Sequence, residues 1–132
     1  MLIGDNMEQD KKLSILDSFI GTQNYYDMGV LFRGIKITDG VRYVSENGYS
    51  YLVTDILSIL TACRKIRRYL ATDYFLSIVF IAYPNRKGEI IFSDGNGNTV
   101  FKKTYRYTDA EVDKIKFFYD ERVKILMLAS EW

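Results

Sequence analysis

The sequence has no histidine and a single cysteine, Cys63, among its 132 residues. Because the chain has no imidazole, we exclude Ser-His and Cys-His nucleophile systems, histidine metal sites and the usual proton carrier near neutral pH. One cysteine cannot close an internal disulfide. Because Cys63 falls at an apolar position of a predicted helix, we interpret it as a small hydrophobic core residue rather than a reactive thiol. The chain therefore lacks the side chains on which many hydrolytic enzymes depend.

Long apolar runs are also scarce. The longest, 75–83 and 125–129, are too short to cross a bilayer and suit buried strands. No charged segment followed by an apolar stretch opens the chain, so we expect a cytoplasmic protein. With 48% hydrophobic and 15% aromatic residues, the chain can bury a core of its own. We expect a flexible leader over 1–11 and one domain over 12–132.

Helical spacing marks the N-terminal half. Residues 13–20 predict a short helix, and Thr38-Asp39 predict the start of a second helix that runs to about Ser45. Between these helices, 30–37 is expected to be extended. After Gly48, a helix capped by Ser50 keeps one apolar face through Leu70.

The pattern then changes to strands. Residues 75–83, 89–93 and 99–107 are rich in β-branched and aromatic residues and predict three antiparallel strands. Turns are expected at 84–88 and 94–98, where proline, glycine and asparagine gather.

The end of the chain completes the predicted fold. Thr108-Asp109 predict the cap of a helix through Tyr119, and 123–128 predict a last strand. The prediction is an α+β domain with an antiparallel sheet of three to four strands packed against a long helix. Shorter helices are expected at the N-terminal side and before the last strand.

Basic residues concentrate in the second half of the chain. The net charge is only +1, yet 64–106 holds nine basic and three acidic residues. A charge run is often only a solvated face, but cations with nearby rings also suit phosphates and partner surfaces. The predicted partner-binding residues are Arg64, Lys65, Arg67, Arg68, Lys102, Lys103 and Arg106, with aromatic contacts from Tyr25, Tyr26 and Tyr105.

Carboxylates supply the remaining candidates for chemistry. One candidate acid-base or metal-binding set consists of Asp39, Glu46 and Asp55. A simpler explanation is that these carboxylates cap helices or lie on solvated helix faces. The run 94–98 resembles the start of a calcium loop but has Thr99 where that loop needs glycine, so we interpret it as a turn. No metal or other cofactor is expected.

Several short motifs carry a family resemblance. They are Phe19-x-Gly21-Thr22-x-x-Tyr25-Tyr26, Thr38-Asp39-Gly40-Val41-x-Tyr43-x-x-Glu46, Asp94-Gly95-Asn96-Gly97-Asn98, Thr108-Asp109 and Ser130-Glu131-Trp132. In order and spacing they resemble a family of small uncharacterised bacterial proteins common on phages and plasmids. Members of that family tend to carry basic residues or a histidine after the tyrosine pair, whereas this chain has Asp27 and Met28. The resemblance implies a genetic setting and no reaction.

Small accessory proteins of mobile elements that lack a catalytic set frequently block a host defence complex. The leading hypothesis is a non-enzymatic inhibitor of anti-CRISPR type that binds a host defence nuclease or its guide RNA complex, as a monomer or homodimer. One alternative is a protein that binds RNA or single-stranded DNA directly through the same cations. A second alternative is a metal-dependent enzyme that uses Asp39, Glu46 or Asp55.

Overall fold

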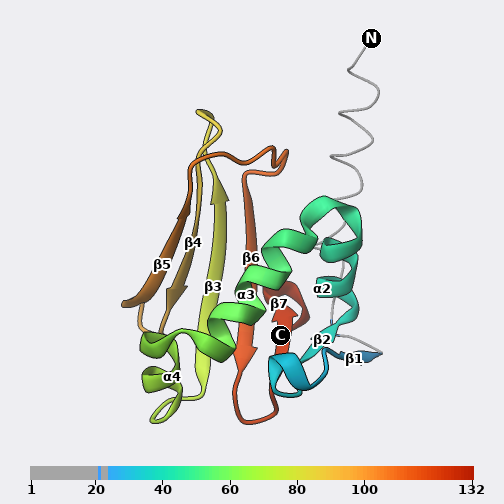
Figure 1. The fold of residues 1–132 in the computed structure, drawn as a ribbon, viewed down its shortest axis with the longest axis vertical. Coiled ribbons are helices and arrows are strands. Elements are labelled where there is room, and N and C mark those ends of the chain that lie inside the picture. Colours follow the sequence, from blue (N-terminus) through green and yellow to red (C-terminus); the bar gives the residue numbers. More distant parts are fainter. Residues whose placement is uncertain (1–20, 22–23) are drawn as a thin grey trace.

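The computed structural model describes residues 21 and 24–132 of the chain. Figure 1 shows a twisted sheet with the helices α2, α3 and α4 on one side of it. The predicted leader 1–11 and the predicted helix 13–20 lie outside the described residues. The described part is a mixed α+β fold, as expected, but its sheet is larger than predicted.

The sheet has seven strands, where the sequence predicted three to four. Their order is β1-β2-β7-β6-β3-β4-β5, and neighbours run antiparallel except β2 and β7, which are parallel. The strands are β1 Tyr25–Asp27, β2 Lys36–Thr38, β3 Phe75–Ala82, β4 Gly88–Ser93, β5 Thr99–Tyr105, β6 Lys114–Asp120 and β7 Ile125–Leu128. The predicted meander of three strands is confirmed as β3, β4 and β5.

The helix α2, Asp39–Val44, begins where the sequence predicted. Thr38 is its N-cap, and Thr38 Oγ1 accepts a hydrogen bond from the amide of Val41 at 3.4 Å. A π-helical segment, Ser45–Tyr49, follows and contains a kink at Gly48, whose φ is 100°. That left-handed backbone is the break predicted for this glycine.

The long helix of the prediction is interrupted. It forms α3, Ser50–Ala62, and α4, Arg64–Leu70, because Cys63 has an extended backbone with φ −73° and ψ 123°. Tyr49, not Ser50, is the N-cap residue of α3, and no side-chain hydrogen bond caps that end. Cys63 is only half-buried, at the break between the helices. Among the described residues, no helix has the length and apolar character needed to span a membrane.

Two other predictions were wrong. The helix expected before the last strand is instead β6, which lies between β3 and β7. The extended segment expected near residue 30 contains a 3-10 helix, Val30–Phe32, before β2 begins at Lys36. A second 3-10 helix, Ala129–Glu131, follows β7.

The core lies between the helices and one face of the sheet. Alternate residues of each central strand point into it, as the period of two in a strand requires. Its fully buried members include Leu52, Ile56, Leu57 and Leu60 from α3, and Leu76, Ile78, Phe80, Phe92, Phe117 and Tyr119 from the strands. The residues between them, such as Phe75, Ser77, Val79 and Phe118, lie on the opposite face, which we call the open face, and are only partly buried.

Candidate functional site

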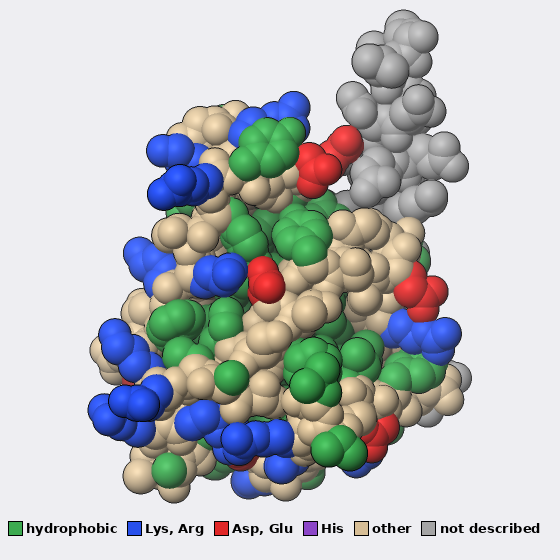
Figure 2. All heavy atoms as spheres, in the orientation of Figure 1, with side chains coloured by type: hydrophobic (Ala, Val, Ile, Leu, Met, Phe, Trp, Pro, Cys, Tyr) green, Lys and Arg blue, Asp and Glu red, His purple; other side chains and the backbone are tan. Residues whose placement is uncertain are grey.

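The predicted cations come together along one side of the molecule. The helix α4 contacts β5, the strand at the end of the sheet, so the cations of both segments share this side. Figure 2 shows Lys and Arg side chains along the side where Figure 1 places β5 and α4. We define the basic edge as Arg64, Lys65 and Arg68 of α4 with Lys102, Lys103 and Arg106 in or after β5.

The α4 cations of the basic edge point into solvent. Ile66 and Leu70 are the buried positions of this short helix, which leaves Arg64, Lys65 and Arg68 exposed on its other faces. Within the described part of the chain, none of these three forms an ion pair. They are therefore available to an anionic partner.

Arg67, a fourth cation of the prediction, has a different position. Its guanidinium donates to the carbonyl of Leu60 at 3.0 Å and to Oε2 of Glu121 at 2.9 Å. These contacts join the end of α3, the helix α4 and the turn after β6. Arg67 therefore holds elements together, and we exclude it from the basic edge.

The β5 cations are loosely paired. Lys102 Nζ lies 3.7 Å from Glu89 and Lys103 Nζ lies 3.9 Å from Asp55, and both lysine side chains are about half exposed. Exposed pairs at such distances contribute little stability. Lys102 and Lys103 can therefore exchange these carboxylates for a phosphate, and the exposed Arg106 continues the edge.

Two of the three predicted aromatic contacts, Tyr25 and Tyr26, do not join the basic edge. Tyr25 and Tyr26 belong to β1, at the opposite end of the sheet. The Tyr26 hydroxyl donates to Asp39 at 2.9 Å, and its ring lies 4.3 Å from the Arg42 guanidinium.

Tyr105 is also occupied within the fold. Its hydroxyl donates to Asp55, and its ring packs edge-on against Tyr51 and Phe80 at 6.0 and 6.2 Å. Burial, followed by the hydrogen bond to Asp55, raises the pKa of Tyr105 well above its ordinary value. This ring anchors β5 against α3, and Nζ of Lys103, a cation of the basic edge, lies 5.5 Å from its centre.

The three candidate carboxylates also have separate partners. Asp39 accepts from Tyr26 and from the amide of Asn24, and Glu46 pairs with Arg42 one helical turn away. Asp55 contacts Tyr105 and Lys103. In the part of the chain that the structure describes, no group of three or more acidic, cysteine or histidine residues is placed to hold a metal.

The run 94–98 is a turn, as the sequence predicted. Asp94 Oδ1 accepts the amides of Asn96 and Asn98 at 2.8 and 2.9 Å, and Asp94 Oδ2 accepts the side-chain amide of Asn98 at 3.0 Å. The hydrogen bonds from Asn98, followed by the one from Asn96, lower the pKa of Asp94. The turn therefore fixes an ionised carboxylate between β4 and β5.

Two of the sequence motifs meet in the fold. The buried carboxylate of Glu131 accepts hydrogen bonds from Thr38 Oγ1 at 2.6 Å, the amide of Gly40 at 3.1 Å and the amide of Leu128 at 2.8 Å. A Cβ on Gly40 would lie 2.6 Å from a methyl group of Leu128 and 2.7 Å from Glu131. The motif glycine therefore permits the close approach of α2 to the end of the chain.

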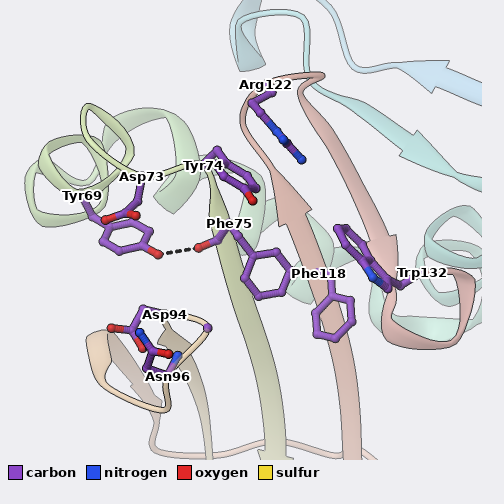
Figure 3. A pocket seen from close by; sticks show the side chains of 10 residues that line it. Tyr69, Asp73, Tyr74, Phe75, Asp94, Asn96, Phe118, Arg122 and Trp132 are labelled. Atoms are coloured by element: carbon purple, nitrogen blue, oxygen red, sulfur yellow. Dashed lines mark hydrogen bonds between the residues drawn. The ribbon is translucent and has the colours of Figure 1, made fainter.

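A cleft on the open face was not predicted from the sequence. It has a volume of about 580 Å³ and is lined by aromatic rings from α4, the start of β3 and the residue before it, β6, and the last residue. We call it the aromatic cleft; its rings are Tyr69, Tyr74, Phe75, Phe118 and Trp132. Figure 3 shows Phe75, Phe118 and Trp132 in a row, with Tyr69 across the gap from them.

The geometry of these rings is well defined. The centroids of Phe75 and Phe118 are 5.1 Å apart, and that of Trp132 lies 5.5 and 5.6 Å from them in edge-to-face contacts. The Tyr69 hydroxyl donates to the carbonyl of Phe75 at 2.6 Å. Phe75 and Phe118 alternate with buried neighbours, and this alternation could have predicted that both rings lie on the open face. It was missed because the residues of β6 were predicted to form a helix.

Charged groups surround the rings. Asp73 and Asp94 lie beside Tyr69, as Figure 3 shows, and Arg122 stacks on Tyr74. The Arg122 guanidinium lies 3.6 Å from the centre of that ring and donates to both oxygens of Asp120 at 3.2 and 2.8 Å. The cleft thus combines aromatic walls with two carboxylates that have no cation paired to them among the described residues.

Comparison with known protein families gives a match over most of the chain. A family model described as a family of unknown function (DUF6876) matches residues 10–132. No curated protein and no solved structure matches significantly.

Proposed function

Because the chain belongs to this family of unknown function, it inherits no reaction, and we propose that it is a non-enzymatic accessory protein of a mobile element. In this proposal it inhibits a host defence nuclease complex, an activity of anti-CRISPR type, by surface binding. The observation that carries the proposal is the basic edge, where α4 and β5 bring together cations that lie far apart in the sequence. The setting on a mobile element rests on the motif pattern.

A guide RNA complex matches the charge of this edge. Guide RNA and its target expose closely spaced phosphates, and cations aligned along one side of a protein neutralise them with release of counterions. Arg64, Lys65 and Arg68 carry no internal ion pair among the described residues, so their binding to phosphate breaks no contact seen in the fold. The protein inhibits a partner bound in this way by covering its surface, and no covalent bond is broken.

Capture from a host with intact defence systems tests the proposal. The tagged chain should recover a defence nuclease or its guide RNA complex at low salt and release it as salt rises. A charge-reversed variant, Arg64→Glu with Lys65→Glu and Arg68→Glu, should recover much less. Recovery of nothing by the unaltered chain, together with unchanged phage plating, would falsify the proposal.

Direct binding of RNA or single-stranded DNA is the second candidate. It is favoured by Tyr107, which is 67% exposed and adjoins Arg106 at the basic edge, where it is available for base stacking. Filter binding of purified protein to a short RNA at two salt concentrations separates the candidates. Tight binding with a steep salt dependence supports this candidate, and the absence of binding removes it.

A further inference from the structure

We propose that the aromatic cleft binds an arginine side chain presented by a partner protein. This site goes beyond the proposed function, because it lies on the open face of the sheet and needs no phosphate. Three features argue for it: the gathering of rings, the sign of the charge around them, and a guanidinium already bound in the same way on the same surface.

The rings of the cleft are placed for contact with a ligand. Trp132 is 65% exposed and Tyr74 is 45% exposed, although large aromatic side chains are usually far more buried. Tyr74 directly precedes β3 and Trp132 follows the last 3-10 helix, and both line one cleft with Phe75 and Phe118. Exposed aromatic groups gathered in a hollow mark an interaction surface better than scattered ones do.

The charge around the rings selects a cation. Asp94 is fixed by the amides of its own turn, whose hydrogen bonds favour its ionised form and lower its pKa. Asp73 is exposed on the connection between α4 and β3 and forms no ion pair in the described chain. Arg122 is already neutralised by Asp120, and Lys116 Nζ lies 5.5 Å from the centre of the Phe118 ring, where it already forms a contact between a cation and a ring of the cleft. A positive group between the rings therefore meets two carboxylates and several ring faces.

The cleft wall shows how a guanidinium binds here. Arg122 stacks at 3.6 Å on the ring of Tyr74 while Asp120 accepts its hydrogen bonds. A planar guanidinium combines stacking with directed hydrogen bonds, which the compact ammonium of lysine does not. A partner arginine placed beside Phe75 and Asp94 would repeat this pairing of ring and carboxylate. A nucleotide could also stack on these rings, but Asp73 and Asp94 repel its phosphate.

The single tryptophan of the chain, Trp132, gives a direct readout. N-acetyl-arginine amide added to the purified protein should change its fluorescence saturably. N-acetyl-citrulline amide has nearly the same shape without the charge, and it should bind at least about ten-fold more weakly. The same comparison followed by NMR confirms that the shifted signals belong to the cleft. Neither measurement involves a defence complex, so its outcome is independent of the proposed function.

Substitution of one carboxylate sharpens the test. Asp73→Asn should weaken binding of arginine amide about three-fold, as expected for one exposed ion pair. Asp113→Asn, which alters an exposed carboxylate not among the cleft residues, should leave binding unchanged. Equal binding of citrulline, no binding of either amide, or an unaffected Asp73→Asn variant overturns the proposal. So does tighter binding of uridine monophosphate than of arginine amide, which would assign the cleft to nucleotides.

Discussion

A single side chain, that of Glu131, joins the segment after β7 to the start of α2. It is buried and accepts three hydrogen bonds, one from a hydroxyl and two from backbone amides. Two of these donors, Thr38 and Gly40, lie at the start of α2. The presence of these motif residues is therefore accounted for by their contacts with one another, and none of them needs a catalytic role.

Glu131→Gln should destabilise the fold by about 2 kcal/mol. The side-chain NH2 of glutamine would be buried against hydrogen-bond donors and would find no acceptor there. Urea unfolding at neutral pH measures this change. Glu111→Gln, at an exposed position, is the control and should change the free energy of unfolding by less than about 0.5 kcal/mol. Equal stability of the two variants would contradict the role given to Glu131.

The carboxyl group of Asp120 is expected to make the stability of the fold depend on pH. Hydrogen bonds from the Arg122 side chain lower its pKa, against the opposing effect of burial. A carboxyl whose pKa is lower in the folded state stabilises the fold above its unfolded pKa, about 3.9, and loses this effect as pH falls through the folded value.

Asp120→Asn should therefore show a smaller loss of stability between about pH 4 and pH 2 than the unaltered chain. The free energy of urea unfolding, measured across this range, tests the expectation. Asp113→Asn is the control and should follow the unaltered chain. If Asp120→Asn also follows it throughout, the carboxyl is not coupled to folding.

At the scale of elements, Arg67 bridges the break between α3 and α4. Its side chain reaches from α4 back to the carbonyl of Leu60 and across to Glu121 after β6. The extended backbone at Cys63 makes this contact possible, since an uninterrupted helix would already bond that carbonyl. The arginine thus replaces hydrogen bonds lost at the break.

Arg67→Gln should lower the free energy of unfolding by about 1 kcal/mol, because a carbonyl and a carboxylate lose their donor. Its neighbour Arg68→Gln, exposed and unpaired among the described residues, should have an effect near zero. Thermal or urea unfolding of both variants measures the difference. Equal effects would show that Arg67, like its neighbour, is only a surface charge.

The sequence predicted those elements whose contacts are local. The meander β3 to β5 was recognised because each turn lies between the strands it joins, and α2 was recognised from its cap, Thr38. β6 was missed because Val112, Ile115 and Tyr119 also fit the spacing of a helix. Its strand conformation is fixed by pairing with β3 and β7, and the β3 partner is distant in the sequence.

The candidate sites were predicted only in part for the same reason. The cations of α4 were visible as a run, but their position beside β5 required the fold. Tyr25 and Tyr105 looked alike in the sequence, yet they lie in strands at opposite ends of the sheet. The aromatic cleft combines residues from four separate segments, a combination that a pattern along the chain does not contain.

At the scale of the whole molecule, the helices cover one face of the sheet and leave two distinct surfaces for partners. The basic edge runs along α4 and β5, and the aromatic cleft lies on the open face of the sheet, where Tyr69 of α4 forms part of its wall. One surface suits phosphates and the other suits a cation. In the account proposed here, a complex of protein and RNA engages the first surface, and an arginine of a protein partner engages the second.

Phage plating on a host with an active defence system tests the central claim most directly. The unaltered chain should restore plaques, and so should a control with Lys36→Glu, Lys114→Glu and Lys124→Glu, which reverses three exposed cations outside both the basic edge and the aromatic cleft. The variant Arg64→Glu with Lys65→Glu and Arg68→Glu, shown to be folded by circular dichroism, should restore none. Full protection of phage by this charge-reversed variant would contradict the account.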